Sequence, residues 1–184
     1  MIWLTSDNHF HHEKIIQLEG RPFLSVEEMN ETLIDRWNLL IKPKDDAYIL
    51  GDLTLGSKKE NIELFPKLNG KKYLIKGNHD RVTKDWYEHF IWIKDYHELK
   101  AFKQTFILFH YPIYSWRKKE KGYIHLHGHT HGGDSHPDFD HALKLNVGVG
   151  LNNYYPLELE HIIEIVEGRK KLLGTENILY ENNS

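Results

Sequence analysis

The feature that most constrains this chain is its alternation of short apolar runs with amphipathic segments. The runs at 1–6, 46–50 and 71–76 are short enough to be buried strands, and polar residues follow each of them directly. Alternation of strand-like and helix-like segments favours an α/β arrangement. The sequence shows no internal repeat, low-complexity tract or Pro/Gly/Ser linker, so we expect residues 1–184 to form a single domain.

Helices are predicted in both halves of the chain. In segment 25–41, Ser25 and Glu28 form a capping-box pattern, and the apolar residues fall on one helical face. Segment 59–68 predicts a second helix. Beyond residue 91 the sequence favours strands, and a last helix is expected. The predicted strands are 91–100, 104–110, 123–127 and 142–149, and the last helix begins at Pro156 and stops near Gly168.

Composition narrows the class of protein. Hydrophobic residues make up 40% and charged residues 28%, with a net charge of −3, which indicates a globular protein without general attraction to nucleic acid or membranes. The absence of cysteine excludes disulfides, thiolate catalysis and cysteine-ligated zinc. The N-terminus does not read as a signal peptide, and no apolar run approaches the roughly 20 residues that span a bilayer. We therefore expect a soluble, cytoplasmic protein.

The polar residues at the strand ends form short motifs that suggest metal binding. In chain order they are SDNH, GD, GNHD, FHYP and GHTH, and the last lies in a stretch with four histidines between 125 and 131. Each motif alone is weak, but glycine before a ligand lets the backbone turn tightly, and the five motifs together are specific. With 14 histidines and no cysteine, a metal site here would use nitrogen and oxygen ligands.

This set of motifs resembles the calcineurin-like metallophosphoesterase superfamily. The match runs from Asp7 to His131, and segment 145–162 is similar to the closing part of its small bacterial and phage-type members. The resemblance implies a four-layer α-β-β-α sandwich, with two mixed sheets flanked by helices and a dinuclear metal site at the strand ends.

The resemblance also implies a role for each motif residue. Asp7, His9 and His131 would hold the first metal, Asn78, His110 and His129 would hold the second, and Asp52 would bridge them. His79 would be the general acid for the leaving group, with Asp80 positioned to orient it. The donor set suits two divalent ions, with Mn²⁺ favoured and Fe²⁺, Ni²⁺ or Zn²⁺ as alternatives. A hydroxide that bridges the two ions would attack phosphorus.

The sequence leaves the roles of several other residues open. His125 and His127 are expected to pack or hydrogen-bond near the ligands rather than bind metal. His11 and His12 either face substrate or lie at the start of a helix. Asn146 is either a turn residue or a contributor to the site. The basic and aromatic segment 114–122 is either a solvated loop or a grip for phosphate or a base, and Gly132-Gly133 would allow the turn after GHTH.

Departures from the superfamily's larger members narrow the function. Asp52 is followed by LTLG and the next motif is GNHD, which disfavours a protein phosphatase, and the chain is too short for large caps. The leading hypothesis is hydrolysis of a phosphodiester, with a small nucleotide or nucleic-acid end as substrate. Phosphomonoester hydrolysis is the alternative, while a metal-retaining scaffold and a histidine-rich storage protein explain the ordered motifs less well. A homo-oligomer is compatible with the sequence.

Overall fold

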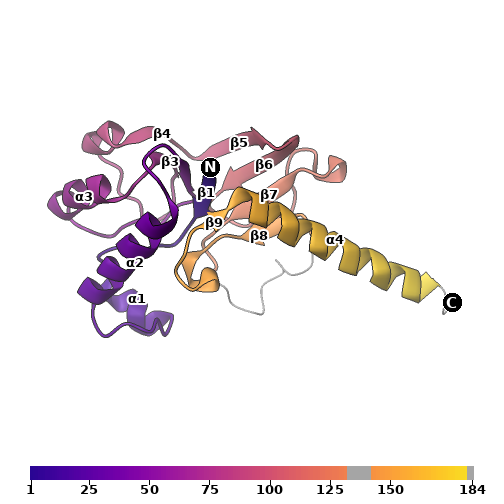
Figure 1. The fold of residues 1–184 in the computed structure, drawn as a ribbon, viewed down its shortest axis with the longest axis horizontal. Helices are drawn as coiled ribbons and strands as arrows, with labels where there is room; N and C mark the ends of the chain where they lie inside the picture. The colour runs from indigo at the N-terminus through magenta and orange to yellow at the C-terminus, as the bar shows by residue number, and fades with distance from the viewer. Residues whose placement is uncertain (132–141, 182–184) are drawn as a thin grey trace.

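The computed structural model describes residues 1–131 and 142–181, with side chains described as far as residue 172. Gly132 and Gly133, expected to allow the turn after GHTH, lie outside the described residues. Within the described part, the strands form two sheets (Figure 1). No helix there is long and apolar enough to cross a membrane.

The first sheet has five strands in the order β4-β3-β2-β1-β9. The strands β1, β2, β3 and β4 run parallel, and β9 pairs antiparallel with β1 at one edge. Their bounds are β1 (Ile2–Thr5), β2 (Asp46–Ile49), β3 (Lys71–Ile75), β4 (Phe90–Lys94) and β9 (Leu157–Glu158). Since parallel strands end at the same edge of a sheet, the motifs after β1, β2 and β3 are brought together there.

The second sheet has four strands in the order β5-β6-β7-β8. An antiparallel pair, β5 and β6, continues into parallel β7 and β8. Their bounds are β5 (Tyr96–Ala101), β6 (Gln104–Phe109), β7 (Ile124–His127) and β8 (Lys144–Asn146). The predicted strand 91–100 is therefore two strands in different sheets, separated at Asp95.

Four α-helices of the described residues pack around the two sheets. The bounds are α1 (Glu13–Leu18), α2 (Val26–Leu40), α3 (Lys58–Leu64) and α4 (Leu159–Glu181). Figure 1 shows α1, α2 and α3 gathered on the side of the first sheet, while α4 leads away from β9 to the C-terminus. The two mixed sheets with helices confirm the predicted fold class.

Strand alternation divides the apolar residues into two cores. Ala47 and Ile49 of β2 face the core that includes the helix residues Met29 and Trp37. Tyr48 and Leu50 face the other way, into a core shared with β6, β7 and the first turns of α4. A period of two is the side-chain repeat of a strand, so β2 is covered on both faces.

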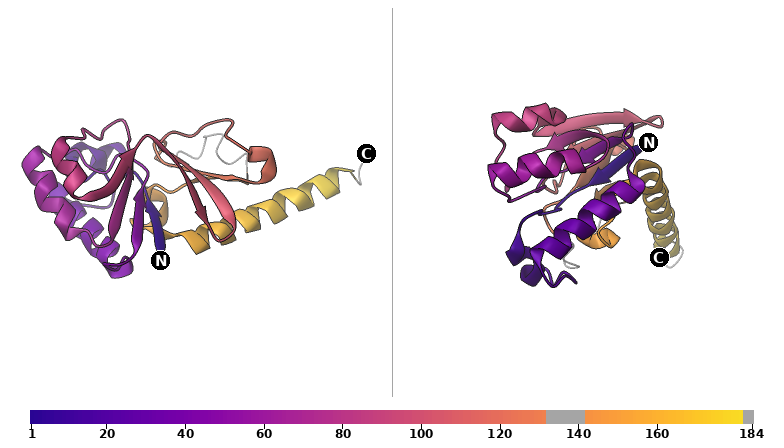
Figure 2. Two further views of the ribbon diagram at one scale, coloured as in Figure 1. Left: turned by 90° about the horizontal axis from the view of Figure 1, so that it is seen from above. Right: turned by 60° about the vertical axis from the view of Figure 1, so that its left-hand side comes forward.

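The predicted last helix differs from α4 at both ends. Leu157 and Glu158 pair with β1 as β9, so the helix begins at Leu159 rather than at Pro156. At the other end α4 continues through Gly168 to Glu181, and both views of Figure 2 show it extending beyond the sheets. A glycine within a helix costs only about 1 kcal/mol relative to alanine, which the good helix formers around it outweigh.

Candidate metal centre

The seven predicted metal ligands meet at the ends of the strands from both sheets. Two groups of donor atoms form there, each with its atoms within 4.8 Å of one another, and Asp52 belongs to both. The first group is Asp7, His9, Asp52 and His131, and the second is Asp52, His110 and His129. The Asn78 side-chain oxygen completes the second group, at 3.1 Å from His110 Nε2 and 3.0 Å from His129 Nδ1.

Two glycines let the motif loops approach one another. A Cβ at Gly77 would overlap Asp52, and a Cβ at Gly128 would overlap Ser6 and Asp7. The GNHD loop can therefore lie against the GD loop, and the GHTH loop against the first motif, only with glycine at these positions.

Asp52 is the centre of the arrangement. Its Oδ1 accepts a hydrogen bond of 2.8 Å from the backbone N–H of His79. Its Oδ2 faces the Nε2 atoms of His110, His9 and His79 at 3.5, 3.8 and 3.9 Å. Burial raises the pKa of Asp52, but His110 and the N–H of His79 lower it by more, so this carboxyl stays ionised.

The His110 ring has a defined orientation. Its Nδ1 lies 2.7 Å from the carbonyl oxygen of Leu50, which can only accept, so Nδ1 carries the proton. Nε2 then directs a lone pair toward the oxygens of Asp52 and Asn78. Burial lowers the pKa of His110, whereas the Asp52 carboxylate and the Leu50 carbonyl raise it by more. These neighbours stabilise a positive charge at Nε2, which a proton or a metal ion can supply.

Two buried polar atoms fit a cation directly. Among the described residues, His9 Nε2 and Asp52 Oδ2 are buried without a hydrogen-bond partner, and they lie 3.8 Å apart. Burial lowers the pKa of His9 to about 2, so the ring is neutral and offers a lone pair. An unpaired buried polar atom costs about 1–3 kcal/mol. A divalent ion between imidazole and carboxylate would satisfy both atoms, so the residues present fit the metals that the sequence predicts.

The burial of Asp7 disfavours its ionised form unless a cation lies nearby. Its side chain is 2% exposed and both oxygens accept the backbone N–H of His129, at 3.0 and 3.1 Å. Desolvation nevertheless raises the pKa of Asp7 to about 6. His131 Nε2 lies 3.9 Å from Asp7 Oδ1. A metal ion shared by these atoms would favour the ionised carboxylate over the protonated one.

The backbone is strained at the same place. Five of the seven predicted ligands have positive φ angles, a region that residues other than glycine rarely adopt. They are Asp7 (54°), His9 (52°), Asp52 (52°), His129 (73°) and His131 (51°). Each such residue costs on the order of 1–3 kcal/mol, and strain of this kind concentrates at functional sites.

His79 and Asp80 lie beside the ligands in different settings. The His79 side chain is 43% exposed, with Nε2 3.9 Å from Asp52 Oδ2, so its ring reaches both the ligands and solvent. The Asp80 carboxylate accepts backbone N–H groups of Asp52, Leu53 and Gly77 at 2.8–2.9 Å. The sequence predicted that Asp80 orients His79, and the hydrogen bonds of its carboxylate are with these three backbone groups. They fix the GD loop against the GNHD loop.

Two residues that the sequence did not single out support the first group. Arg21, only 4% exposed, donates to the backbone carbonyls of Asn8 (2.9 Å) and Asp7 (2.8 Å) and to Glu19 Oε2 (2.8 Å). The other Glu19 oxygen contacts Nδ1 of His131. A carboxylate at one ring nitrogen fixes which nitrogen is free for a metal. Neither residue belongs to a motif, so nothing in the sequence indicates this role.

The remaining histidines near the site have distinct contacts. His12 Nδ1 lies 3.3 Å from His9 Nδ1, whereas His11 turns away and bonds Asn30. His125 is buried and its ring nitrogens contact backbone groups on β6 and in the loop after it. His127 Nδ1 lies 2.9 Å from the Gly128 carbonyl oxygen.

Asn146 and segment 114–122 also have structural contacts. Asn146 Nδ2 donates to the Thr130 hydroxyl (3.0 Å), so it supports the GHTH loop from β8. In segment 114–122, Trp116 is buried and Lys119 lies over its ring, while Arg117 pairs with Glu98 at 2.7 Å. Much of the basic and aromatic character of this loop is therefore used within the protein.

Comparison with known proteins agrees with this geometry. The model of the calcineurin-like phosphoesterase family matches residues 1–103, more than half of the chain. The chain belongs to this family. The matched part contains Asp7, His9, Asp52 and the GNHD motif. His110, His129 and His131 follow it in sequence but lie at the same centre in space.

Relatives extend the likeness over nearly the whole chain. An uncharacterized protein of Methanocaldococcus jannaschii is 38% identical over 183 residues, covering 97% of each chain. The Gene 66 protein of Mycobacterium phage L5 is 28% identical over 178 residues, covering 80% of this chain and 85% of that protein. A crystal structure of a protein of unknown function from Aquifex aeolicus has a TM-score of 0.74 at 26% identity, and the match covers 90% of this chain and 98% of that one.

Proposed function

We propose that this phosphoesterase hydrolyses small phosphodiesters with two divalent metal ions, and we favour Mn²⁺ among the ions that mixed oxygen and imidazole donors can hold. Asp7, His9 and His131 would hold one ion, Asn78, His110 and His129 would hold the second, and Asp52 would serve both. The observation that carries the proposal is the convergence of both donor groups on Asp52 beside an exposed His79. We also propose that the chain acts as a single domain in the cytoplasm, on the basis of its sequence.

The reaction adds water across one P–O bond. A diester and water give a phosphomonoester, an alcohol and a proton. The metal ions, when bound, activate the water and neutralise charge on the phosphoryl oxygens. His79 donates a proton to the leaving oxygen, and its exposed ring lets it regain that proton from solvent. Asp80 and Arg21 contribute indirectly, because they fix the backbones of the loops that carry the ligands.

A diester is favoured over a monoester by the charges around the site. A monoester dianion is typically bound by arginine side chains that face its oxygens. Arg21, the buried arginine nearest the ligands, has its donors directed to Asp7, Asn8 and Glu19. Because these Arg21 donors are not free for a phosphate dianion, we favour a singly charged diester at the ligands. Retention of all seven ligands and of His79 disfavours a scaffold without activity.

The test is hydrolysis of bis(4-nitrophenyl) phosphate and 4-nitrophenyl phosphate by the Mn²⁺-loaded protein and by Asp52→Asn. We expect the diester to be the better substrate and the substitution to reduce its turnover by about 100-fold or more, because Asp52 serves both ions. Asp35→Asn, an exposed change on α2 with the same loss of charge, is the control. Preference for the monoester would favour the alternative, and full activity of Asp52→Asn would contradict the two-metal proposal.

A further inference from the structure

A pocket includes His79 in its lining. It is lined by Thr54, Leu55, Gly56, Ser57, Asn61, His79 and Arg81, and we call it the leaving-group pocket. His79 thus lines this pocket while its Nε2 lies 3.9 Å from Asp52 Oδ2.

The wall of the leaving-group pocket is held by its own hydrogen bonds. The Thr54 hydroxyl donates to Asn61 Oδ1 (2.8 Å) and accepts the N–H of Gly56 (3.0 Å), and Asn61 Nδ2 donates to the Gly56 carbonyl (3.1 Å). These polar groups are satisfied by one another. The wall is therefore preformed. Because its polar groups already bond one another, a charged group of a ligand would be bound by the other lining residues.

Among the described residues that line this pocket, Arg81 is the arginine and none is a carboxylate. Within the described part of the chain, the exposed Arg81 has neither an ion pair nor a hydrogen bond. Its guanidinium is a planar set of donors that matches phosphate or carboxylate oxygens. An unpaired arginine beside the proposed proton donor is therefore available to an anionic group of the substrate.

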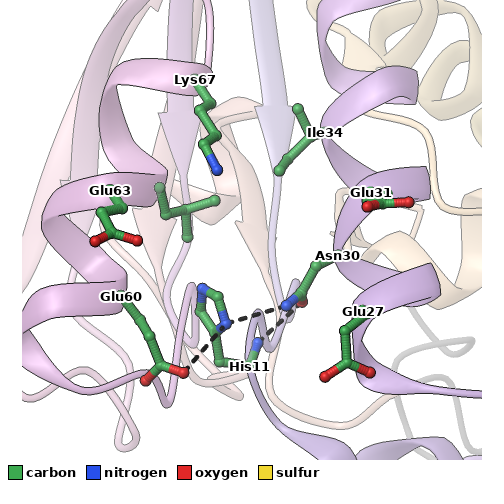
Figure 3. Close-up of a pocket in the computed structure, with 9 residues that line it drawn as sticks. His11, Glu27, Asn30, Glu31, Ile34, Glu60, Glu63 and Lys67 are labelled. Atoms are coloured by element: carbon green, nitrogen blue, oxygen red, sulfur yellow. Dashed lines mark hydrogen bonds and ion pairs between the residues drawn. The ribbon is translucent and has the colours of Figure 1, made fainter.

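The neighbouring pocket provides a contrast within the same molecule. It lies between α2 and α3, and Figure 3 shows His11 among the residues that line it. Four carboxylates line it together with a single lysine, Lys67. They are Glu27, Glu31, Glu60 and Glu63. This acidic pocket would repel a phosphate, so an anionic substrate group is directed to the side of Arg81.

We infer that the leaving-group pocket binds a second anionic group, best a phosphate, carried by the alcohol that leaves. The inference rests on the proposed function. A general acid must lie within reach of the leaving oxygen, so the leaving alcohol is on the His79 side of phosphorus. Leu55 offers an apolar surface for a sugar or base, and Arg81 offers the charge. The preferred substrate is then a diester whose leaving nucleoside bears a terminal phosphate.

The kinetic test compares thymidylyl-thymidine with its two analogues that carry one added terminal phosphate, at the 5′ or at the 3′ end. The products show which oxygen leaves, so one analogue has its phosphate on the leaving nucleoside and the other on the retained one. We expect KM to be about tenfold lower when the leaving nucleoside is phosphorylated. Arg81→Gln should abolish this difference, whereas Lys84→Gln, which removes an exposed charge outside the pocket, should preserve it.

A second measurement does not depend on turnover. Metal-free protein is titrated with thymidine 5′-monophosphate or thymidine, and the NMR signals of the arginine Nε–H groups are followed, with Arg81→Gln identifying the Arg81 signal. We expect a saturable shift of that signal with the nucleotide and none with the nucleoside. Absence of the shift, or a lower KM for a phosphate on the retained nucleoside, would overturn the inference. A saturable shift without hydrolysis of any diester would support the pocket and refute the proposed function instead.

Discussion

The two halves of the candidate metal centre share Asp52 but are built differently. In the first half, Asp7 and His9 are buried, and a second layer of side chains supports them. Arg21 fixes the backbone of the first motif through its carbonyls, and Glu19 links this arginine to the ring of His131. The first motif is therefore held by contacts within the protein, and the partly exposed His131 is contacted by Glu19.

The second half is more open. His110 is buried and fixed by the Leu50 carbonyl, but Asn78 is exposed and His129 is only partly buried. Tyr111 packs edge-on to His129, with ring centroids 4.6 Å apart, at the solvent boundary. Since a preorganised donor set binds more tightly than one that must be ordered, we expect the first half to hold its ion more strongly. We expect the open half to be the one that admits substrate.

The largest expected effect comes from a substitution that should impair proton transfer while both metals stay bound. His79 faces Asp52 but is exposed, so His79→Gln should retain both metals while turnover of an alkyl diester falls by about 10²–10⁴-fold. The loss should be smaller for a nitrophenyl ester, which needs no proton on its leaving group. Steady-state rates on both esters, with metal content measured alongside, check this. Equal losses on the two esters would contradict the general-acid role.

A smaller effect is expected from a substitution that changes only a side chain supporting the first half. Glu19→Gln keeps an oxygen for Arg21 but removes the charge beside His131, so we expect the affinity for the tighter ion to fall by about 10–100-fold. The weaker ion should be unaffected. Isothermal titration with Mn²⁺ measures both, and Glu13→Gln, an exposed change on α1, is the control. Equal weakening of both ions would mean that the halves are not independent.

Part of this centre could be predicted from the sequence because its signals are local. A short apolar run followed by Asp, Asn or His predicts a strand that delivers a polar residue to the sheet edge, as for Asp7 and Asp52. Glycines at 77 and 128 mark the places where two loops approach closely. These signals indicated which residues the structure brings together, and the class of fold.

The supporting interactions could not be predicted, because they depend on contacts distant in sequence. Asp80 holds the N–H groups of Asp52 and Leu53, which no spacing within GNHD indicates. The positive φ of His9 and His131 is imposed by packing on residues that do not favour it. The same holds for α4, which passes through Gly168 although a glycine near a helix end usually signals a stop.

The most direct test of the two unequal halves is a calorimetric titration of the metal-free protein with Mn²⁺, beside Asp52→Asn. The account predicts two binding steps of clearly different affinity, both weakened when Asp52 loses its charge. A single step with one ion per chain, or two steps that Asp52→Asn leaves unchanged, would contradict a centre in which Asp52 joins a buried half to an open one.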